Sequence, residues 1–517
     1  MLLTKLCLSA GLAYALSGSG PKAPVQGVVP PLGAAADTIY DLLRQSADAV
    51  GGLDHLQAVR AVRVEEVGHE RMISTATRSD GPRRLAAQKL ITVRHRAPDG
   101  LRRHLEQFFV TRPQPTSSTL VVSDGVAMTE RGGVTAAGTA FDLAVGQEEL
   151  ALAPERVLLT ALGAGNSRLL PDRVIDGARY HVVAFRSAGM EVELSINGVT
   201  KFPERVVVVR AYPTNVFWAM WGDIRFETVW SSWSLGPSGI WYPRQRTTSL
   251  NGEPFREYIV THLDLAANIP RDSLTIPDSV RQAFRQLAAS ADVQAGSPAD
   301  PVPIAEGVVL LRTGYQSVIV RQPDGLVIIE APESAARSRA VLSEAGRRFP
   351  GLPVKAVVST SPMWMHIGGI REYAARGIPI FALDTNIPIL RRLLAAPHRS
   401  APDSLARRPR SAPLHVVRGP LQLGRGSNRI TLIPARGQQG ASMLLAYLPE
   451  HRLLYASDVL IPERFEPNFA AGYRAELIRT VERLRLPVSA VFALHLPLIP
   501  WRTIIEGGPL ERNPGGD

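Results

Sequence analysis

The stretch Val357-Val358-Ser359-Thr360-Ser361-Pro362-Met363-Trp364-Met365-His366-Ile367-Gly368-Gly369 decides the fold of the second half of this 517-residue chain. Its apolar start predicts a buried strand, which runs into a turn and then into a helix opened by Gly368-Gly369. On either side of it, short apolar strands alternate with helices. We expect strands at 307–311, 317–321, 326–329, 354–359, 378–382, 429–433, 443–448, 452–455 and 488–493, and helices at 335–349, after His366, at 387–395 and at 473–485.

The first half of the chain has a different texture. Two helices are expected at its start, the first capped by Asp37 and the second at Leu53 to Val59. Alternating segments separated by signals such as Asn197-Gly198 then predict antiparallel hairpins. We therefore expect an α+β protein, with an antiparallel β-rich domain with one or two helices at 37–270, a linker at 271–303 that holds a helical piece, and a second domain at 304–517.

The N-terminus has the parts of a secretory signal peptide. Lys5 precedes an apolar run that ends in small residues, which predicts a signal peptide at 1–17 and a flexible leader at 18–36. Cys7 is the only cysteine of the sequence and would be lost on cleavage. The expected location is periplasmic or secreted, without a stable membrane span.

The net charge of +11 comes mainly from arginines that are scattered along the chain. No dense basic run with interleaved aromatic residues occurs, so we expect no nucleic-acid partner and a small-molecule substrate or ligand instead. The sequence does not indicate an oligomeric state.

The order of the elements beyond residue 304 resembles the metallo-β-lactamase fold, a four-layer αββα sandwich. The resemblance covers about residues 304 to 505. The segments that carry it are 307–311, 326–332, 357–369, 437–442, 448–458 and 491–495.

The resemblance also implies where metal ligands would lie. The His-x-His-x-Asp-His motif of that family falls on Ser361, Met363, Met365 and His366, and the later Gly-His falls on Gly437-Gln438. One of the two metal sites of the family is therefore vacated. The other keeps His366, Asp458 and His495, which as two imidazoles and a carboxylate are sufficient ligands for one zinc or iron ion. In that interpretation Asp458 and His366 are also the catalytic residues, because a single ion can activate water.

Two alternatives to a metal site stay open at this point. Either the polar residues are leftovers of a lost centre that hydrogen-bond among themselves, or Ser361 and His366 form a nucleophile and its base. Glu330 stands where the fold often has a supporting aspartate. The loop at 397–420 is expected to overhang the cleft.

The closing strands of the first domain, from Gly222 to Pro270, resemble those of lipoprotein-carrier-like β domains. Such sheets curl around an apolar ligand. Five tryptophans either line such a groove or fill the core, namely Trp218, Trp221, Trp230, Trp233 and Trp241.

Two functional hypotheses follow. The first is an exported hydrolase-like protein with a degraded dinuclear site, in which at most one zinc or iron ion activates water toward an ester, lactam or phosphodiester. The second is a non-catalytic pseudoenzyme without a metal that binds an apolar or anionic ligand.

Overall fold

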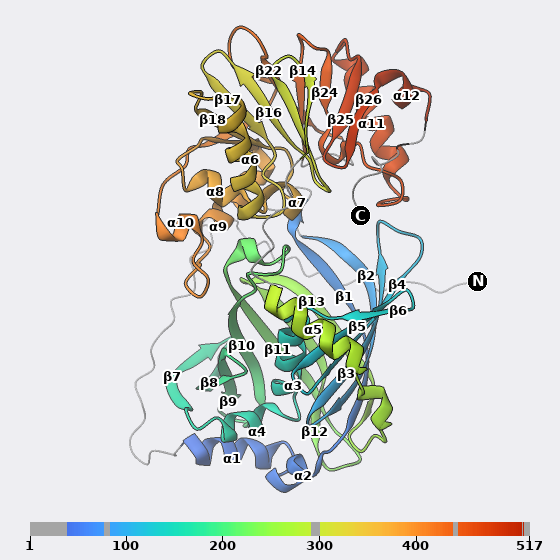
Figure 1. The fold of residues 1–517 in the computed structure, drawn as a ribbon. Coiled ribbons are helices and arrows are strands. Elements are labelled where there is room, and N and C mark those ends of the chain that lie inside the picture. Colours follow the sequence, from blue (N-terminus) through green and yellow to red (C-terminus); the bar gives the residue numbers. More distant parts are fainter. Residues whose placement is uncertain (1–38, 77–82, 291–299, 438–442, 509, 511–517) are drawn as a thin grey trace, which may run out of the picture.

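A computed structural model describes residues 39–76, 83–290, 300–437, 443–508 and 510. The expected signal peptide, leader and Asp37 cap lie outside these residues, as does Gln438. The chain forms a β-rich unit and an α/β unit that lie end to end (Figure 1). Among the described residues, no helix is long and apolar enough to cross a membrane.

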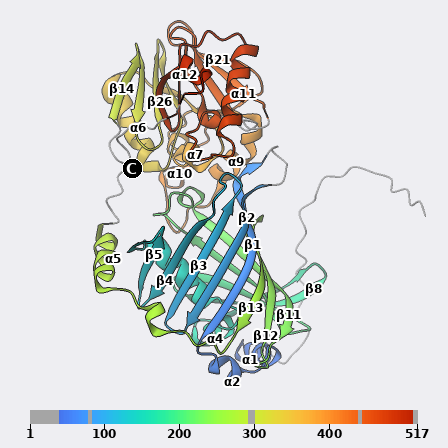
Figure 2. The ribbon, with the colours of Figure 1, turned by 90° about the vertical axis from the view of Figure 1, so that its right-hand side faces the viewer.

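The β-rich unit is one strongly curved antiparallel sheet, which Figure 2 shows from the side of β1 and β2. The chain meanders from β1 to β6 on one side and from β7 to β13 on the other, and β13 pairs with β1 to join the two sides. The strands are β1 (Val62–Ala76), β2 (Arg83–Ala97), β3 (Gly100–Phe109), β4 (Thr116–Ser123), β5 (Val126–Arg131), β6 (Val134–Ala137), β7 (Arg168–Ile175), β8 (Ala178–Ser187), β9 (Met190–Asn197), β10 (Pro203–Ala211), β11 (Asp223–Leu235), β12 (Trp241–Leu250) and β13 (Glu253–Asp264).

Helices cover this sheet in three places. The helices α1 (Ile39–Ala49), α2 (Leu53–Ala58) and α4 (Val157–Gly163) pack on one end through an apolar cluster that includes Leu43 and Leu158. The helix α3 (Ala140–Ala151) lies against β3, β4 and β5. Helix α5 (Asp278–Ser290) falls within the expected linker, yet its Phe284 packs on the sheet.

The second unit contains two sheets that face each other. The first sheet is β14 (Asp300–Ala305), β15 (Val308–Arg312), β16 (Ser317–Gln322), β17 (Gly325–Ile329), β18 (Val354–Ser359), β19 (Ile380–Leu383) and β20 (Leu414–Val417). The second is β21 (Leu421–Leu423), β22 (Ile430–Ala435), β23 (Met443–Leu448), β24 (Leu453–Tyr455), β25 (Ala490–Ala493) and β26 (Leu496–Pro500).

Helices cover the outer faces of both sheets. Residues such as Val358 and Tyr455 form the core between the sheets. On the outside of the first sheet lie α6 (Ala335–Arg348), α7 (Trp364–Ile367), α8 (Ile370–Ala374), α9 (Ile387–Ala395) and α10 (Ser404–Arg407); on the outside of the second lie α11 (Ala470–Arg483) and α12 (Trp501–Ile505). These layers are helix, sheet, sheet and helix, in the order expected from the sequence.

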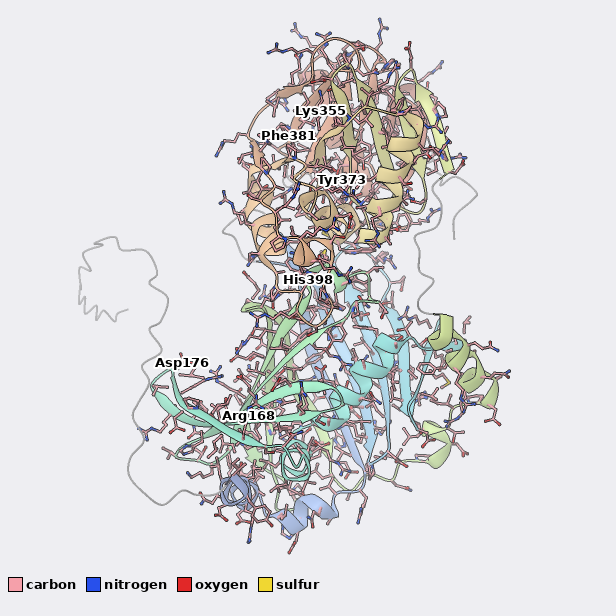
Figure 3. All side chains as sticks on the ribbon, turned by 60° about the vertical axis from the view of Figure 1, so that its left-hand side comes forward. Arg168, Asp176, Lys355, Tyr373, Phe381 and His398 are labelled. Atoms are coloured by element: carbon pink, nitrogen blue, oxygen red, sulfur yellow. The ribbon has the colours of Figure 1, made fainter. Side chains whose placement is uncertain are left out.

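The two units share one apolar cluster. Trp221 and Ile224 of the β-rich unit belong to the same buried cluster as Ile367 and Leu390 of the second unit. Figure 3 shows His398 where the units meet. Its ring is buried, and Nε2 lies 3.2 Å from the carbonyl oxygen of Met220.

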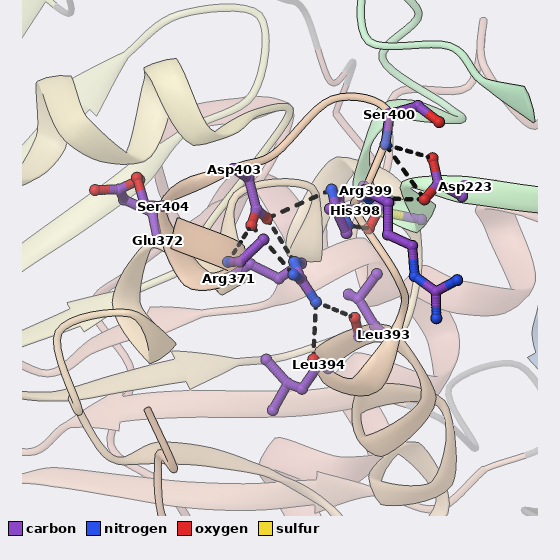
Figure 4. A network of polar contacts seen from close by, with 12 residues as sticks. Asp223, Arg371, Glu372, Leu393, Leu394, His398, Arg399, Ser400, Asp403 and Ser404 are labelled. Carbon is purple, nitrogen blue, oxygen red and sulfur yellow. Dashed lines mark hydrogen bonds and ion pairs between the residues drawn. The ribbon is translucent and has the colours of Figure 1, made fainter. Parts of the chain in front are cut away.

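The loop after α9 crosses to the β-rich unit (Figure 4). The backbone N–H groups of Arg399 and Ser400 donate to the carboxylate of Asp223 at 2.7 and 3.1 Å. Burial would raise the pKa of Asp223, but these hydrogen bonds and the nearby His398 lower it. On the other side, Arg371 donates to the carboxylate of Asp403. The start of the loop at 397–420 therefore fastens the two units together. Residues 398, 401–404 and 407 also line a cleft between the units, and the expected overhang of the candidate site stays a prediction.

Candidate functional site

The candidate site lies at the ends of β17, β18 and β24, where the chain leaves the core between the sheets. Glu330 follows β17, Thr360 follows β18, and Ser457 and Asp458 follow β24. His366 belongs to the short helix α7, which the Ser361-Pro362 turn places directly above these strand ends. Elements far apart in the sequence thus bring five polar side chains together.

His366 is fully buried between two carboxylates. Its Nδ1 lies 3.0 Å from Oε1 of Glu330, and its Nε2 lies 2.8 Å from Oδ2 of Asp458. Because carboxylate oxygens accept hydrogen bonds, both ring nitrogens serve as donors in this arrangement. Burial would lower the pKa of His366, but the charges of Glu330 and Asp458 outweigh burial and raise it to about 10. The ring is therefore an imidazolium near neutral pH, and we call these three residues the buried triad.

The two carboxylates are held by further groups. Tyr455 donates a hydrogen bond of 3.1 Å to Oε1 of Glu330, and the hydroxyl of Thr360 contacts the same oxygen. Thr360 also lies 2.6 Å from the hydroxyl of Ser457. Burial would raise the pKa of Asp458, but the charge of His366 lowers it. Both carboxylates thus lie against the same buried imidazole ring.

The backbone at this site has unusual torsion angles. Glu330 has a φ of 74° and Ser457 a φ of 51°, in the left-handed region that residues with a side chain rarely adopt. Such angles cost on the order of 1 kcal/mol or more and persist where the surroundings hold them in place. The hydrogen bonds of Thr360 to both side chains provide such a constraint.

His495 lies at the outer side of the triad. Its Nε2 is 3.6 Å from Oδ1 of Asp458, an oxygen that is buried without a hydrogen-bond partner among the described residues. The rings of Tyr315 and Phe465 pack on His495 at 5.3 and 5.0 Å.

Trp364 extends this aromatic cover toward the other unit. It packs on Tyr315 and, at 4.4 Å, on Phe217 of the β-rich unit. A chain of aromatic contacts therefore runs from Phe217 of the β-rich unit through Trp364 and Tyr315 to His495.

The structure brings the three predicted ligands His366, Asp458 and His495 together, but as a chain of ion pairs. In the part of the chain that the structure describes, no group of three or more histidine, cysteine, aspartate or glutamate side chains has the arrangement of a metal site. Both nitrogens of His366 face carboxylates in this arrangement, so a metal would have to displace the Nε2 proton that binds Asp458. The three residues would hold an ion only after the His366–Asp458 ion pair opens, and metal binding by this trio stays a prediction.

The other sequence hypotheses fare differently. The hydroxyl of Ser361 accepts from the backbone N–H of Met363, and no hydrogen bond of the described residues joins Ser361 to His366. Thr360 takes the place beside His366 that the nucleophile hypothesis gave to Ser361. Glu330 has the expected supporting role and contacts the histidine directly.

Sequence reasoning missed Thr360, Tyr455 and Ser457. All three lie within the quoted segments, and each directly adjoins or closely precedes a residue that was singled out. The signal that identifies them is their place at strand ends, where polar side chains of neighbouring strands meet.

The five tryptophans divide between the two expected roles. Trp218 and Trp230 line a cavity inside the curved sheet. Trp221 is in the shared apolar core, whereas Trp233 and Trp241 pack on Phe202.

No protein-family model matches the chain, and no curated protein matches it. Among solved structures, the inverting sec-alkylsulfatase Pisa1 from a Pseudomonas species is similar at 16% identity and a TM-score of 0.31, over 40% of each chain. The chain thus spans 40% of the length of that enzyme. A metallo-β-lactamase from Pontibacter korlensis has 16% identity and a TM-score of 0.32, over 40% of this chain and 96% of its own. The metallo-β-lactamase TMB-1 has 13% identity and a TM-score of 0.33, over 41% of this chain and 95% of its own. Similarity of this degree says nothing about the activity of this chain.

Proposed function

We propose that this chain is a non-catalytic binding protein for an apolar or anionic small molecule, built on a metallo-β-lactamase-like unit that has lost its dinuclear centre. The observation that carries the proposal is the buried triad, in which both ring nitrogens of His366 face carboxylates. A histidine held in this way stabilises the fold, and carboxylates occupy both ring nitrogens in place of a metal or a substrate. The aromatic cover of Phe217, Trp364, Tyr315 and Phe465 supports the same interpretation.

A second candidate is a hydrolase with one zinc or iron ion held by His366, Asp458 and His495. The observation in its favour is Oδ1 of Asp458, which is buried without a hydrogen-bond partner among the described residues and lies 3.6 Å from Nε2 of His495. Buried polar atoms normally have a partner, so an oxygen of this kind is a place where an ion could bind.

Metal analysis separates the two candidates. The full mature chain is purified after supplementation with zinc, iron and manganese, and its metal content is compared with those of His366→Ala and His415→Ala. His415 is an exposed histidine that stacks on Phe381 outside the site, and it serves as the matched control.

The binding-protein proposal expects all three proteins to have the same low metal content and to hydrolyse none of a panel of ester, lactam, thioester and phosphodiester substrates. Metal close to one ion per chain that is lost only in His366→Ala, together with hydrolysis, would overturn it in favour of the one-metal hydrolase.

We also propose that the protein is exported to the periplasm or secreted, on the basis of the apolar run after Lys5. N-terminal sequencing of the protein from its native host tests this: a start near residue 18 supports export, and an intact Met1 contradicts it.

A further inference from the structure

The curved sheet of the β-rich unit encloses a cavity of about 260 Å³. Its walls come from strands on both sides of the sheet and from helix α3, which lies in the hollow of the sheet (Figure 1). A typical small-molecule site has a volume of roughly 300 to 1,000 Å³, so this cavity suits a small ligand. Its lining is unusual for a carrier of purely apolar molecules, because it contains both charged and aromatic side chains.

At the charged part of the cavity, three guanidinium groups share two carboxylates. Arg94 contacts both Glu66 and Glu149, Arg103 lies 2.9 Å from Glu149, and Arg246 lies 3.2 Å from Glu66. Three guanidinium groups and two carboxylates leave this group of five with one positive charge in excess. The side chains of Arg103 and Arg246 are 21% and 26% exposed, so an anion from solution can reach this charge and compensate it.

The other arginines around the cavity have a carboxylate each. Arg96 makes two hydrogen bonds to Glu155, at 2.8 and 3.0 Å, and Arg256 lies 2.7 Å from Glu70. Glu148 also lines the cavity, and its carboxylate lies 3.7 Å from the guanidinium of Arg210. These three pairs are balanced. They place the excess charge at Arg94, Arg103 and Arg246.

The ring of Tyr258 lies beside two of these guanidinium groups. The guanidinium groups of Arg94 and Arg246 lie 5.4 and 4.7 Å from its centroid. Burial would raise the pKa of Tyr258, but Arg256, Arg94 and Arg246 together lower it.

Several buried donors at the cavity have no hydrogen-bond partner among the described residues. They are the hydroxyl of Thr92, Nε1 of Trp230 and Nε of Arg246. Thr92 is fully buried and Trp230 is 3% exposed. Buried donors without partners are rare in folded proteins, and here they line the same cavity as the excess cation.

Aromatic rings form the remaining part of the lining. Trp218 packs edge-on against Phe226 and Phe255, and Tyr212 packs edge-on against Phe141 and Phe226. This part of the cavity offers apolar contacts, whereas the arginines offer charge.

We propose that the cavity binds a small amphiphilic organic anion, with a headgroup such as a carboxylate at Arg94 and Arg246 and an apolar body against the aromatic rings around Trp218. This inference rests on the proposed function: the cavity is the site of the physiological ligand if the protein is a binding protein. The excess positive charge and the donors without partners would bind an anionic headgroup, and the aromatic lining of the same cavity would pack on an apolar body.

Calorimetric titration of the full chain, treated with a chelator, tests the inference. Octanoate is the probe, octanol is its uncharged analogue and octyltrimethylammonium its cationic analogue. Octanoate is expected to bind and to change the fluorescence of Trp218 and Trp230, whereas both analogues bind more weakly by about tenfold or more, because an ionic hydrogen bond is lost.

Arg246→Met removes the excess cation. It is expected to weaken octanoate binding about tenfold or more and to leave the melting temperature of the ligand-free protein unchanged or higher, since the remaining charges balance. Arg168→Met is the control, because Arg168 (labelled in Figure 3) makes an exposed ion pair with Glu191, and neither residue lines the cavity. Should Arg246→Met fail to fold, Thr92→Val replaces it: the change preserves shape, removes a hydroxyl that has no partner, and is expected to weaken octanoate binding several-fold.

The inference is overturned if octanoate does not bind, if octanol or octyltrimethylammonium binds as tightly, or if the cavity variant that folds binds octanoate as the wild type does. A protein that holds a metal and hydrolyses substrates would overturn the proposed function and leave the octanoate result standing.

Discussion

The buried triad predicts a large loss of stability when its central cation is removed. In His366→Leu, the carboxylates of Glu330 and Asp458 remain in the interior without the ring that each contacts at 3.0 and 2.8 Å. Removing one partner of a buried ion pair costs about 3–5 kcal/mol, and here one substitution breaks two pairs. We therefore expect the free energy of unfolding to fall by at least about 3 kcal/mol at neutral pH.

The loss is expected to depend on pH with a defined sign. Without the imidazolium, burial raises the pKa of the Asp458 carboxyl group in the folded variant above its value in the unfolded chain. The folded variant then binds protons that the unfolded chain has released, so the stability of His366→Leu falls as pH rises from about 5 to 8.

Equilibrium urea unfolding of chelator-treated protein, followed by circular dichroism, measures both effects. The triple variant Glu330→Gln, His366→Leu, Asp458→Asn removes the charges together and should recover part of the stability. His415→Leu is the control and should cost less than about 1 kcal/mol, as is usual for an exposed side chain. A His366→Leu protein as stable as the control, or equally stable at pH 5 and 8, would refute the structural role given to the triad.

Three further predictions concern the β-rich unit and its junction. Asp223→Ala leaves two backbone N–H groups of the 397–420 loop without their acceptor, so we expect a loss of about 3 kcal/mol and faster proteolysis of that loop; unchanged proteolysis would contradict the fastening role. Burial would raise the pKa of Glu149, but Arg94 and other arginines lower it to about 2, so its contribution to stability is complete above pH 4.5 and is lost as pH falls toward 2; Glu149→Gln should flatten this acid limb of the stability curve, and a curve that keeps it would exclude Glu149 as the cause. Glu155→Gln leaves the buried guanidinium of Arg96 without its carboxylate and should cost about 3–5 kcal/mol in urea unfolding, whereas a cost below about 1 kcal/mol would show that the pair is dispensable.

The sequence predicted elements best where apolar residues run without interruption. The strand at 354–359 and the helix at 387–395 have the expected bounds, because a continuous apolar run and a clear amphipathic face mark them. Helix α3 was missed between strands, although Thr139 and Asp142 form a capping box that would have indicated its start. The short strands β20 and β21 were missed because they lie within or directly after the stretch at 397–420, which was expected to be a loop.

The candidate site could be predicted only in part. The resemblance placed His366, Asp458 and Glu330 in one region. It could not show that both ring nitrogens of His366 face carboxylates, since those contacts join residues 36 and 92 positions apart. The charge of the sheet cavity was equally hidden, because Arg94, Glu149 and Arg246 come from different strands and a helix, and only the closed sheet brings them together.

The apolar cluster common to the two units has a consequence for how the protein unfolds and evolves. Trp221 and Ile224 lose their packing partners if the second unit melts, and Ile367 and Leu390 lose theirs if the sheet opens. Melting should therefore occur as one cooperative transition, and fragments cut between α5 and β14 should associate or aggregate through the apolar faces they expose. Such a pair of units would be inherited together, because replacing one unit would expose the apolar face of the other unless that face also changed.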